Sequence, residues 1–551
     1  MNGADLLVRG LERAGVSVAF GLPGVHNLPL WAALANSDIR LVGVRHEQTA
    51  AYAADGYARA TGRLGVAVTT TGPGAANTLG AVGEAWASGS PILVIATDIP
   101  TTVRRRGVYR GALHETTDQA GMFSPVTKAM VQAAPTDDLG WLAWTAAETA
   151  LAAPTRPVYL EIPTDLLSAE FVSSWPPPHD PPEQNAGAAD EAAEDRAAEI
   201  LAGAQRPLIW AGGGALRSGA GSAVGALAER LGAPVLTTYQ ARGLLSPDHP
   251  CDVGLPPHIP EAGALWDAAD VVVAIGSDLD GMMTQNWAMP QPPTLIAINV
   301  DGADATKNYQ ADLVLVGDAA EVASALAVRL AAVDDLDRLA GDSQWLRLTL
   351  DRADAIAGLR SDFLDEMRFL DVLDHALPPE TVIVADMCIP GYWVAGFRRF
   401  AGPRQLAYPV GWGTLGFAFP ASLGSALAGT GPVVSISGDG GFLFACGELA
   451  TVAQEQIPLT SVIVDDGGYG MLRYDQRRAG DSPFGVDLDT PDFAALSESF
   501  GVRSETVEGL GDDFGGALKR HVAMAEPTVL VASAALQPPP TTSPRWYRHG
   551  G

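Results

Sequence analysis

Two acidic positions in the last third of the chain have the residue types and surroundings of a divalent cation site. In residues 433–471, VVSISGDGGFLFACGELATVAQEQIPLTSVIVDDGGYGM, one strand-like run ends at Gly438-Asp439-Gly440 and the next ends at Asp465-Asp466. Neighbouring parallel strands end at the same edge of a sheet, where α/β proteins bind ligands. Asp439 and Asp466 beside glycine-rich backbone therefore predict a hard oxygen site that suits Mg²⁺, with a phosphate as a further ligand. A lone GDG is more often a simple turn, so the prediction rests on the whole strand–GDG–helix–strand–acid arrangement.

The elements that must position these acids repeat along the chain as alternating strands and helices. Helical patterns cover 47–61 and 75–88, for example. Alternation of this kind is typical of parallel sheets covered by helices on both faces. We therefore predict an α/β protein with three domains of parallel sheet flanked by helices. The expected strands include 16–20, 40–44, 65–70, 91–96, 207–210, 271–275, 294–299, 381–385, 433–437 and 459–464.

Changes in composition mark the boundaries of the three domains. A chain of 551 residues is too long for a single core, and its proline-rich polar stretches are typical of linkers and irregular ends. The predicted domains are residues 1–170, 191–332 and 366–536, with a linker at 175–190, a charged helical connector at 333–365 and a tail at 537–551.

The formal net charge of −29 excludes several classes of partner. A surface this acidic repels phosphate backbones and anionic lipids, so we expect no binding to nucleic acid or to membrane surfaces. Three widely spaced cysteines, Cys251, Cys388 and Cys446, predict reduced thiols and a cytoplasmic protein. The first residues lack a signal-peptide pattern, and no stretch has the length and apolarity to span a bilayer.

The segment 433–471 resembles the diphosphate-binding motif of thiamine-diphosphate enzymes, which opens with GDG and ends at a metal-binding Asn or Asp. The resemblance, which extends to the acetolactate-synthase-like members of that family, implies that Asp439, Asp466 and the backbone carbonyl of Gly468 hold Mg²⁺. The ion would then bridge the diphosphate of thiamine diphosphate. The same segment is expected to contact the cofactor at Gly438, Asp439, Gly440, Gly441, Asp466, Gly468, Tyr469, Gly470 and Met471.

One residue departs from the family pattern, because relatives close this motif with Asn-Asn or Asn-Asp where this chain has Asp465-Asp466. Three carboxylates beside a diphosphate would give one divalent cation too much negative charge. Successive strand residues also point to opposite faces. We therefore expect Asp465 to point away from the metal and to accept local backbone hydrogen bonds.

The first domain carries the second half of the resemblance. Residues 44–62, VRHEQTAAYAADGYARATG, are similar to the stretch that holds the family's catalytic glutamate, and Glu47 matches that residue. Its carboxyl group would protonate the aminopyrimidine ring of the cofactor and so promote loss of a proton from the thiazolium ring. Without the GDG segment, Glu47 could equally be a solvated residue at a helix N-terminus. We expect its neighbour His46 to be structural.

Three further patches agree with the family. Residues 69–86 resemble its glycine-rich loop beside the pyrimidine ring, and residues 411–424 resemble the segment whose apolar side chain props the cofactor into a bent shape. Leu415 matches that prop, although core packing alone would also explain a leucine there. Together with the loop at 21–29, these patches supply the remaining predicted cofactor contacts: Pro23, Gly24, Thr71, Gly72, Asn77, Gly413 and Leu415.

The resemblance places two histidines where the substrate binds. Val25 and His26 lie in the loop at 21–29 and are expected to face the substrate. His114 lies in GALHETTDQ, residues 111–119, a stretch near the reacting carbon where relatives carry Gln or His. Because histidine titrates near neutrality, both histidines are candidate catalytic proton donors. The alternative is that either one only hydrogen-bonds the cofactor or the backbone.

The implied activity is decarboxylation of a 2-oxo acid, followed by release of an aldehyde or by carboligation of the enamine intermediate to a second carbonyl compound. Acetolactate synthesis from pyruvate is the first alternative. Against it, Asp475 stands where biosynthetic synthases carry a pocket tryptophan, and the middle domain lacks their GMHG- and RFDDR-like patches. The PGVH and LHE loops resemble those of decarboxylases that act on a guanidino-bearing 2-oxo acid. The carboxylate of Asp475 would suit the positive charge of such a substrate. A non-catalytic scaffold is the other alternative, and the retained Glu47, Asp439 and Asp466 argue against it.

The resemblance also implies a homodimer or homotetramer, with active sites between the first domain of one subunit and the third domain of another. Trp546 and Tyr547 in the tail could cover such a site as a lid, or the tail could be an irregular end. FAD could approach Gly212-Gly213-Gly214 but is not favoured, since glycine-rich loops of this kind are weak signals.

Overall fold

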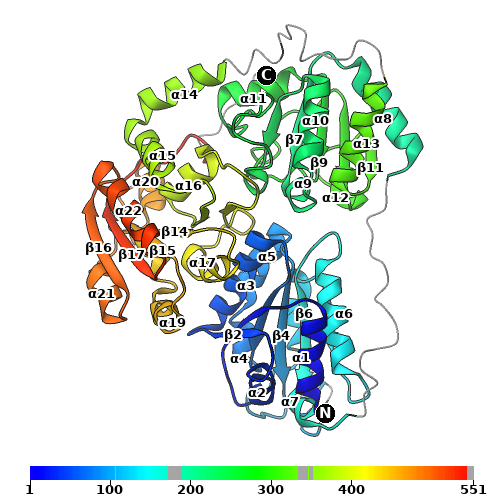
Figure 1. Ribbon diagram of the computed structural model, residues 1–551, viewed down its shortest axis with the longest axis vertical. Coiled ribbons are helices and arrows are strands. Elements are labelled where there is room, and N and C mark those ends of the chain that lie inside the picture. Colours follow the sequence, from blue (N-terminus) through cyan, green and yellow to red (C-terminus); the bar gives the residue numbers. More distant parts are fainter. Residues whose placement is uncertain (106, 172–188, 333–344, 346–350, 543–551) are drawn as a thin grey trace.

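The computed structural model describes residues 1–105, 107–171, 189–332, 345 and 351–542. These residues form three lobes, each built on a parallel sheet with helices packed on it (Figure 1). In this view the N-terminal lobe lies at the bottom, the C-terminal sheet at the left and the central sheet at the upper right. The prediction of three α/β units with parallel sheets is confirmed.

The N-terminal sheet has the strand order β2-β1-β3-β4-β6-β5, and each neighbouring pair is parallel. Its middle strands are buried along their whole length because apolar and small residues fill them, as in GVAVT of β3. The strands are β1 (Val18–Gly21), β2 (Arg40–Gly43), β3 (Gly65–Thr69), β4 (Ile92–Asp98), β5 (Ala129–Gln132) and β6 (Val158–Pro163). The helices are α1 (Gly3–Arg13), α2 (Leu28–Leu34), α3 (Glu47–Thr61), α4 (Pro73–Ala76), α5 (Leu79–Ser88), the 3₁₀ helix η1 (Ala120–Val126), α6 (Leu139–Leu151) and α7 (Thr164–Ser168).

The central sheet has the order β11-β10-β9-β7-β8, again parallel throughout. Asp190 and Asp318 begin helices by accepting backbone N–H groups of the first turn. The strands are β7 (Pro207–Ala211), β8 (Val235–Thr237), β9 (Val271–Ile275), β10 (Leu295–Asn299) and β11 (Leu313–Val316). The helices are α8 (Glu191–Gly203), α9 (Gly213–Arg217), α10 (Gly221–Leu231), η2 (Tyr239–Ala241), α11 (Pro260–Ala268), α12 (Gly302–Thr306) and α13 (Ala319–Ala331).

The C-terminal sheet has the order β13-β12-β14-β15-β17-β16 and is also parallel. Gly438 at the end of β14 pairs with Val464 near the end of β15, so these two strands finish together. The strands are β12 (Val382–Ala385), β13 (Leu406–Ala407), β14 (Val433–Gly438), β15 (Thr460–Asp465), β16 (Arg503–Glu508) and β17 (Thr528–Ser533). The helices are α14 (Asp351–Asp362), α15 (Leu364–Ala376), α16 (Ile389–Phe397), α17 (Ala418–Leu427), α18 (Asp439–Phe442), η4 (Cys446–Glu448), α19 (Leu449–Glu455), α20 (Gly470–Ala479), α21 (Phe493–Ser499) and α22 (Asp512–Met524).

Helix α3 of the first lobe packs directly on α17 of the third. A Cβ atom added at Gly56 would lie 1.9 Å from the carbonyl oxygen of Ala421, and one added at Gly424 would lie 1.8 Å from that of Ala53. The two glycines therefore allow the helix backbones to touch, where any side chain would separate them. This contact fixes the first lobe to the third lobe of the same chain.

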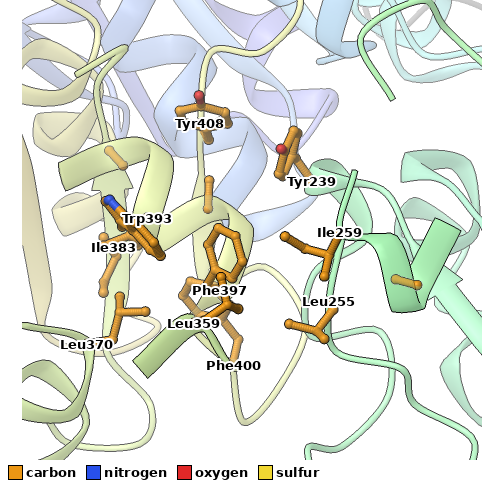
Figure 2. Packing of buried hydrophobic residues seen from close by; sticks show 14 of the residues in the cluster. Tyr239, Leu255, Ile259, Leu359, Leu370, Ile383, Trp393, Phe397, Phe400 and Tyr408 are labelled. Carbon is orange, nitrogen blue, oxygen red and sulfur yellow. The ribbon is translucent and has the colours of Figure 1, made fainter. Parts of the chain in front are cut away.

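The central lobe joins the third through a cluster of aromatic and aliphatic side chains (Figure 2). Tyr239, Leu255 and Ile259 come from the central lobe, and Trp393 and Phe400 come from α16 and the loop after it. All five side chains are buried. The cluster makes the three lobes one continuous structure.

Some sequence predictions differ from the structure or lie outside its described residues. The helix expected over 75–88 is divided into α4 and α5, because the chain turns at Asn77 and Thr78. Most of the linker at 175–190, part of the connector at 333–365, and Trp546 and Tyr547 lie outside the described residues. No described helix has the length and apolarity to cross a membrane.

The described start of the tail is held against the third lobe. Trp393 Nε1 donates to the carbonyl oxygen of Gln537 at 2.7 Å, and the Gln537 N–H donates to Glu366 Oε1 at 2.6 Å. The chain therefore leaves β17 in a fixed direction over α15 and α16.

Candidate active site

The predicted acidic pair lies at the carboxyl edge of the third sheet. Asp439 opens α18 directly after β14, and Asp466 follows β15. Asp439 is 1% exposed, and its Oδ2 atom and Asp466 Oδ1 are buried without a hydrogen-bond partner in the described structure. Buried carboxylate oxygens are costly unless a proton or a cation meets them. The donor set therefore fits a divalent metal ion, to which the nearby Gly468 carbonyl could add a third oxygen.

The raised pKa values of Asp439 and Asp466 also favour a bound cation. The pKa of Asp439 is raised to about 7, chiefly because burial penalises the charged form and secondarily because Asp466 and Asp465 repel it. Burial also raises the pKa of Asp466, against the attraction of Arg473. A cation bound between the two carboxylates would relieve both penalties.

Asp465, the last residue of β15, was expected to accept local backbone hydrogen bonds and to point away from the metal. Its Oδ1 accepts the Gly467 N–H at 3.1 Å, and its Oδ2 accepts the Thr490 hydroxyl at 3.4 Å, so the predicted backbone hydrogen bond is present. Asp465 also raises the pKa of Asp439 and so lies close to the metal pair; that its oxygens stay off a bound metal remains a prediction. The register of β14 and β15 explains the contact, because it places residue 465 beside residue 439.

Glycines shape the backbone around the acids. A Cβ atom at Gly470 would lie 2.1 Å from Asp466 Oδ2, and one at Gly440 would lie 2.7 Å from the ring of Tyr469. Only glycine leaves room for the carboxylate over the start of α20 and for the ring over α18. The other predicted contacts of this segment, Gly438, Gly441, Gly468 and Met471, lie in the same strand ends and helix starts.

The loop that carries the predicted prop is anchored by Asp386. Gly416 N–H donates to Asp386 Oδ2 at 3.0 Å and Phe417 N–H donates to Oδ1 at 3.4 Å, while Gly413 adopts a positive φ of 68°. Leu415 is half-buried between these points. Burial raises the pKa of Asp386 to about 6. Sequence reasoning missed Asp386, although an acid directly after the buried run 381–385 was a usable signal.

Glu47 occupies a buried helix start in the first lobe. It is the first residue of α3, and its Oε2 accepts the side-chain N–H of Asn77 at 3.0 Å. His46 caps the helix by accepting the Gln48 N–H, so its predicted structural role is confirmed. The Glu448 carboxylate accepts the backbone N–H groups of Arg45 at 3.0 Å and His46 at 3.0 Å. Glu448, which sequence reasoning missed, therefore fixes the backbone that carries Glu47.

The two predicted histidines meet. The rings of His26 and His114 lie edge to face with centroids 5.3 Å apart. Burial lowers the pKa of His26, the charge of His114 lowers it further, and Asp98 opposes both effects. His26 is therefore neutral at pH 7 and can accept a proton or donate one N–H. Val25 beside it is 60% exposed.

The histidine loops depend on glycine and on close backbone contacts. Gly72 has φ 66° and ψ −110°, and an added Cβ atom there would lie 2.6 Å from the carbonyl oxygen of His114. A Cβ atom added at Gly24 would likewise lie 2.6 Å from the side chain of Thr70. Thr71 is fully buried and hydrogen-bonds Thr97, and Pro23 precedes Gly24 in the half-exposed turn.

Two further side chains hold these loops and were not predicted. Gln119 Oε1 accepts the Gly72 N–H at 2.5 Å, and its Nε2 donates to Tyr159 and Glu161. Arg104 pairs with Asp98 and donates to the carbonyl oxygen of Thr116. Gln119 lies in the 111–119 stretch that drew attention to His114, so its position was available from the sequence but its contacts were not.

The predicted residues gather into two groups. Glu47, Asn77 and the histidine loops form one group on the first lobe, and the acidic pair forms the other on the third. Four cavities in the described part of the chain lie elsewhere, and none of the four is lined by Glu47, His26 or Asp439. Asp475 lies on α20.

Three parallel α/β units, an acidic pair after neighbouring strands and a buried glutamate at a helix start define the class of thiamine-diphosphate enzymes. Family models agree: the N-terminal TPP binding domain of thiamine pyrophosphate enzymes matches residues 1–122, the central domain 195–326 and the C-terminal TPP binding domain 387–532. The chain belongs to the thiamine pyrophosphate enzyme family.

Relatives named for their activities are similar to nearly the whole chain. A probable 2-ketoarginine decarboxylase of Pseudomonas aeruginosa is 35% identical over 505 residues, which cover 91% of this chain and 88% of that protein. A probable acetolactate synthase large subunit of Methanocaldococcus jannaschii is 33% identical, with 96% and 91% covered. An acetolactate synthase of Mycobacterium bovis is 32% identical, with 93% and 85% covered. The resemblance to acetolactate-synthase-like thiamine-diphosphate enzymes is thus confirmed.

Proposed function

We propose that this protein is a thiamine-diphosphate- and Mg²⁺-dependent enzyme that decarboxylates a 2-oxo acid and releases an aldehyde or joins the remaining carbons to a second carbonyl compound. The observation that carries the proposal is the pair Asp439 and Asp466, each with a buried carboxylate oxygen that has no hydrogen-bond partner in the described structure. Such a pair at the edge of a parallel sheet suits a metal ion that holds a diphosphate.

The two groups of site residues would have different roles in the reaction. Asp439, Asp466 and the Gly468 carbonyl would hold Mg²⁺, and Leu415 would support the cofactor from the neighbouring loop. When bound, thiamine diphosphate supplies the nucleophilic carbon and the electron sink of decarboxylation. Glu47, oriented by Asn77 at 3.0 Å, would hold the proton exchanged with the aminopyrimidine ring.

His26 and His114 are proposed to face the substrate. Their edge-to-face contact and the lowered pKa of His26 keep at least one ring neutral. A neutral imidazole beside the reacting carbon can donate or take up a proton as the product forms. Asp475 on α20 is the proposed contact for a cationic end of the substrate.

We favour a larger or cationic 2-oxo acid as the donor. Support comes from Asp475 in place of the pocket tryptophan and from similarity to the 2-ketoarginine decarboxylase. Acetolactate synthesis from pyruvate is the second candidate, favoured by similarity to several acetolactate synthases. The two candidates predict different products from different acids.

The test is a product analysis of the loaded enzyme. Protein saturated with thiamine diphosphate and Mg²⁺ is given single 2-oxo acids, with and without aldehyde acceptors, and products are identified by mass spectrometry. Aldehyde or acyloin from a guanidino-bearing acid, with pyruvate poor, supports the first choice. Acetolactate from pyruvate selects the second. Glu47→Gln is the inactive control, and equal traces from both proteins would refute an enzymatic role.

We further propose a homodimer or homotetramer with active sites between subunits. Large apolar side chains stand exposed near both groups of site residues, including Val25 at 60%, Leu113 at 67% and Phe484 at 88%. Large apolar side chains left in water are candidates for burial against a partner surface. A partner subunit that covers them would bring the Glu47 group of one chain to the acidic pair of another.

Subunit mixing tests this arrangement. Glu47→Gln and Asp439→Asn proteins are each expected to be inactive. After unfolding and refolding together, a hybrid dimer would contain one intact site, so random mixing should restore roughly a quarter of the wild-type activity. Sites built within single chains would give no recovery.

Flavin does not enter the proposal. Gly213 and Gly214 line a large cavity between the lobes, together with Asp278 and Asp280 and with Arg217 and Lys307. The lining carries charges of both signs, so it shows no specific preference for the diphosphate of a dinucleotide. A purified protein without flavin absorbance is expected, and a yellow protein would contradict this view.

A further inference from the structure

Arginines converge on a small cavity between the central and third lobes, and no residue of the candidate active site lines it. Arg242 follows η2 of the central lobe, Arg399 follows α16 of the third, and Arg352 lies in the first turn of α14. Arg242, Arg399 and Asp252 line the cavity. The place adjoins the apolar cluster of Figure 2, because Gly254 precedes Leu255 and Arg399 precedes Phe400.

Gly254 marks the point where these groups meet. It has a φ of 68°, and a Cβ atom added there would lie 3.2 Å from Arg399 Nε, 3.3 Å from Asp252 Oδ2 and 3.6 Å from Arg352 Cζ. Two guanidinium groups and one carboxylate therefore face the same small space. The missing side chain at Gly254 is what leaves that space open.

The donors there are only partly used. Arg399 Nη2 donates to Asp252 Oδ2 at 2.6 Å and also to the carbonyl oxygen of Pro247, and Arg242 Nη2 donates to the Gly396 carbonyl at 2.6 Å. The Nε atoms of Arg242 and Arg399 are buried without a partner in the described structure, and Arg242 is 5% exposed. A buried N–H of a charged group without an acceptor is costly. An acceptor supplied from solution would remove that cost.

The charge of the cluster is also unbalanced. Among the described groups, Asp252 is the carboxylate that supports Arg242 and Arg352, while Arg399 repels both. Burial and this repulsion lower the pKa of both guanidinium groups. The chain as a whole has a formal net charge of −29, whereas this buried cluster has an excess of positive charge. It therefore calls for a specific anion.

We infer that Arg242, Arg352 and Arg399 form a binding site for a phosphate-type dianion at the junction of the central and third lobes. Guanidinium groups bind such oxyanions through paired N–H donors. The cavity is too small to enclose a nucleotide, so the expected ligand is a compact oxyanion. Three positive charges against Asp252 leave an excess that a dianion neutralises. The site is independent of the activity proposed above.

The test measures phosphate binding to the protein saturated with thiamine diphosphate and Mg²⁺, so that the cofactor site is already filled. Isothermal titration with inorganic phosphate is run at constant ionic strength against sodium chloride. Wild type is compared with Arg352→Gln, which changes a half-exposed side chain, and with Arg399→Gln. Arg503→Gln is the control, because Arg503 is an exposed residue paired with Glu526 on the third lobe.

We expect saturable binding at one site per chain, weakened about tenfold or more in Arg352→Gln and Arg399→Gln, and unchanged in Arg503→Gln. A phosphate monoester is titrated as well. Equal binding of the ester assigns the site to phosphate esters, and binding of phosphate alone assigns it to the free ion. No saturable binding, or equal binding by all four proteins, would overturn the inference.

Discussion

Metal binding should depend steeply on pH near neutrality. The pKa of Asp439 is raised to about 7, so its carboxylate is about nine-tenths ionised at pH 8 and about one-tenth ionised at pH 6. A metal ion must displace that proton. Affinity for the ion should therefore fall about tenfold between pH 8 and pH 6, which is ~1.4 kcal/mol of binding free energy. The direction is fixed, because only the ionised carboxylate binds.

The assay is a titration of the cofactor-free protein with Mn²⁺, whose electron paramagnetic resonance signal reports the free ion and which prefers the same oxygen ligands. Asp439→Asn keeps an oxygen ligand but cannot titrate, so it should bind more weakly and lose most of the pH dependence. Asp512→Asn is the matched control, since Asp512 is 87% exposed and paired with Arg368. Wild-type affinity that stays constant from about pH 6 to pH 8 would refute the reasoning.

Three other predictions concern residues that support the site. The protonated form of Asp386 contributes stability that is complete below its ordinary pKa of 3.8 and is lost as pH rises through about 6. The free energy of unfolding of wild type should therefore fall by about 1.4 kcal/mol relative to that of Asp386→Asn between pH 5 and pH 8. Thermal unfolding that changes with pH equally in both proteins would contradict this. Glu448→Gln weakens charged hydrogen bonds to the backbone before Glu47, so kcat should fall while KM changes little. The free energy of unfolding should drop by about 1–3 kcal/mol. Unchanged steady-state kinetics would refute the positioning role of Glu448. Gly72→Ala should cost about 1–3 kcal/mol and lower activity, because its backbone conformation excludes a side chain, whereas Gly80→Ala, with open space around it, should leave melting temperature and activity nearly unchanged.

The sequence predicted the parts of the fold that carry strong local patterns. Buried parallel strands such as β9, VVVAI, read as short apolar runs, and their observed ends lie within a residue or two of the expected ones. Strand β16, RSETVE, was not expected, because an edge strand with exposed polar residues lacks such a run. The same limit explains the division of the helix at 75–88, which depends on how the chain turns at Asn77.

In the candidate site, too, residues in local patterns were predictable and residues that act through long-range contacts were not. Asp439 and Asp466 were predictable because one short segment contains both strands and both acids. Asp386 and Glu448 act on backbone groups far away in sequence, at Gly416 and at Arg45, so no local pattern reveals their roles. The contact of Asp465 with Asp439 depends on strand register, which the sequence leaves open.

The glycine contact between α3 and α17 has a genetic consequence. In the proposed assembly, each chain supplies the Glu47 group to one active site and the acidic pair to another. Helix α3 carries Glu47 and is fixed to the lobe that carries the acidic pair, through Gly56 and Gly424. A chain with a bulky residue at either glycine would displace one half of two different sites. Such a variant, produced together with the wild-type protein, would therefore inactivate more sites than it contributes and act dominantly.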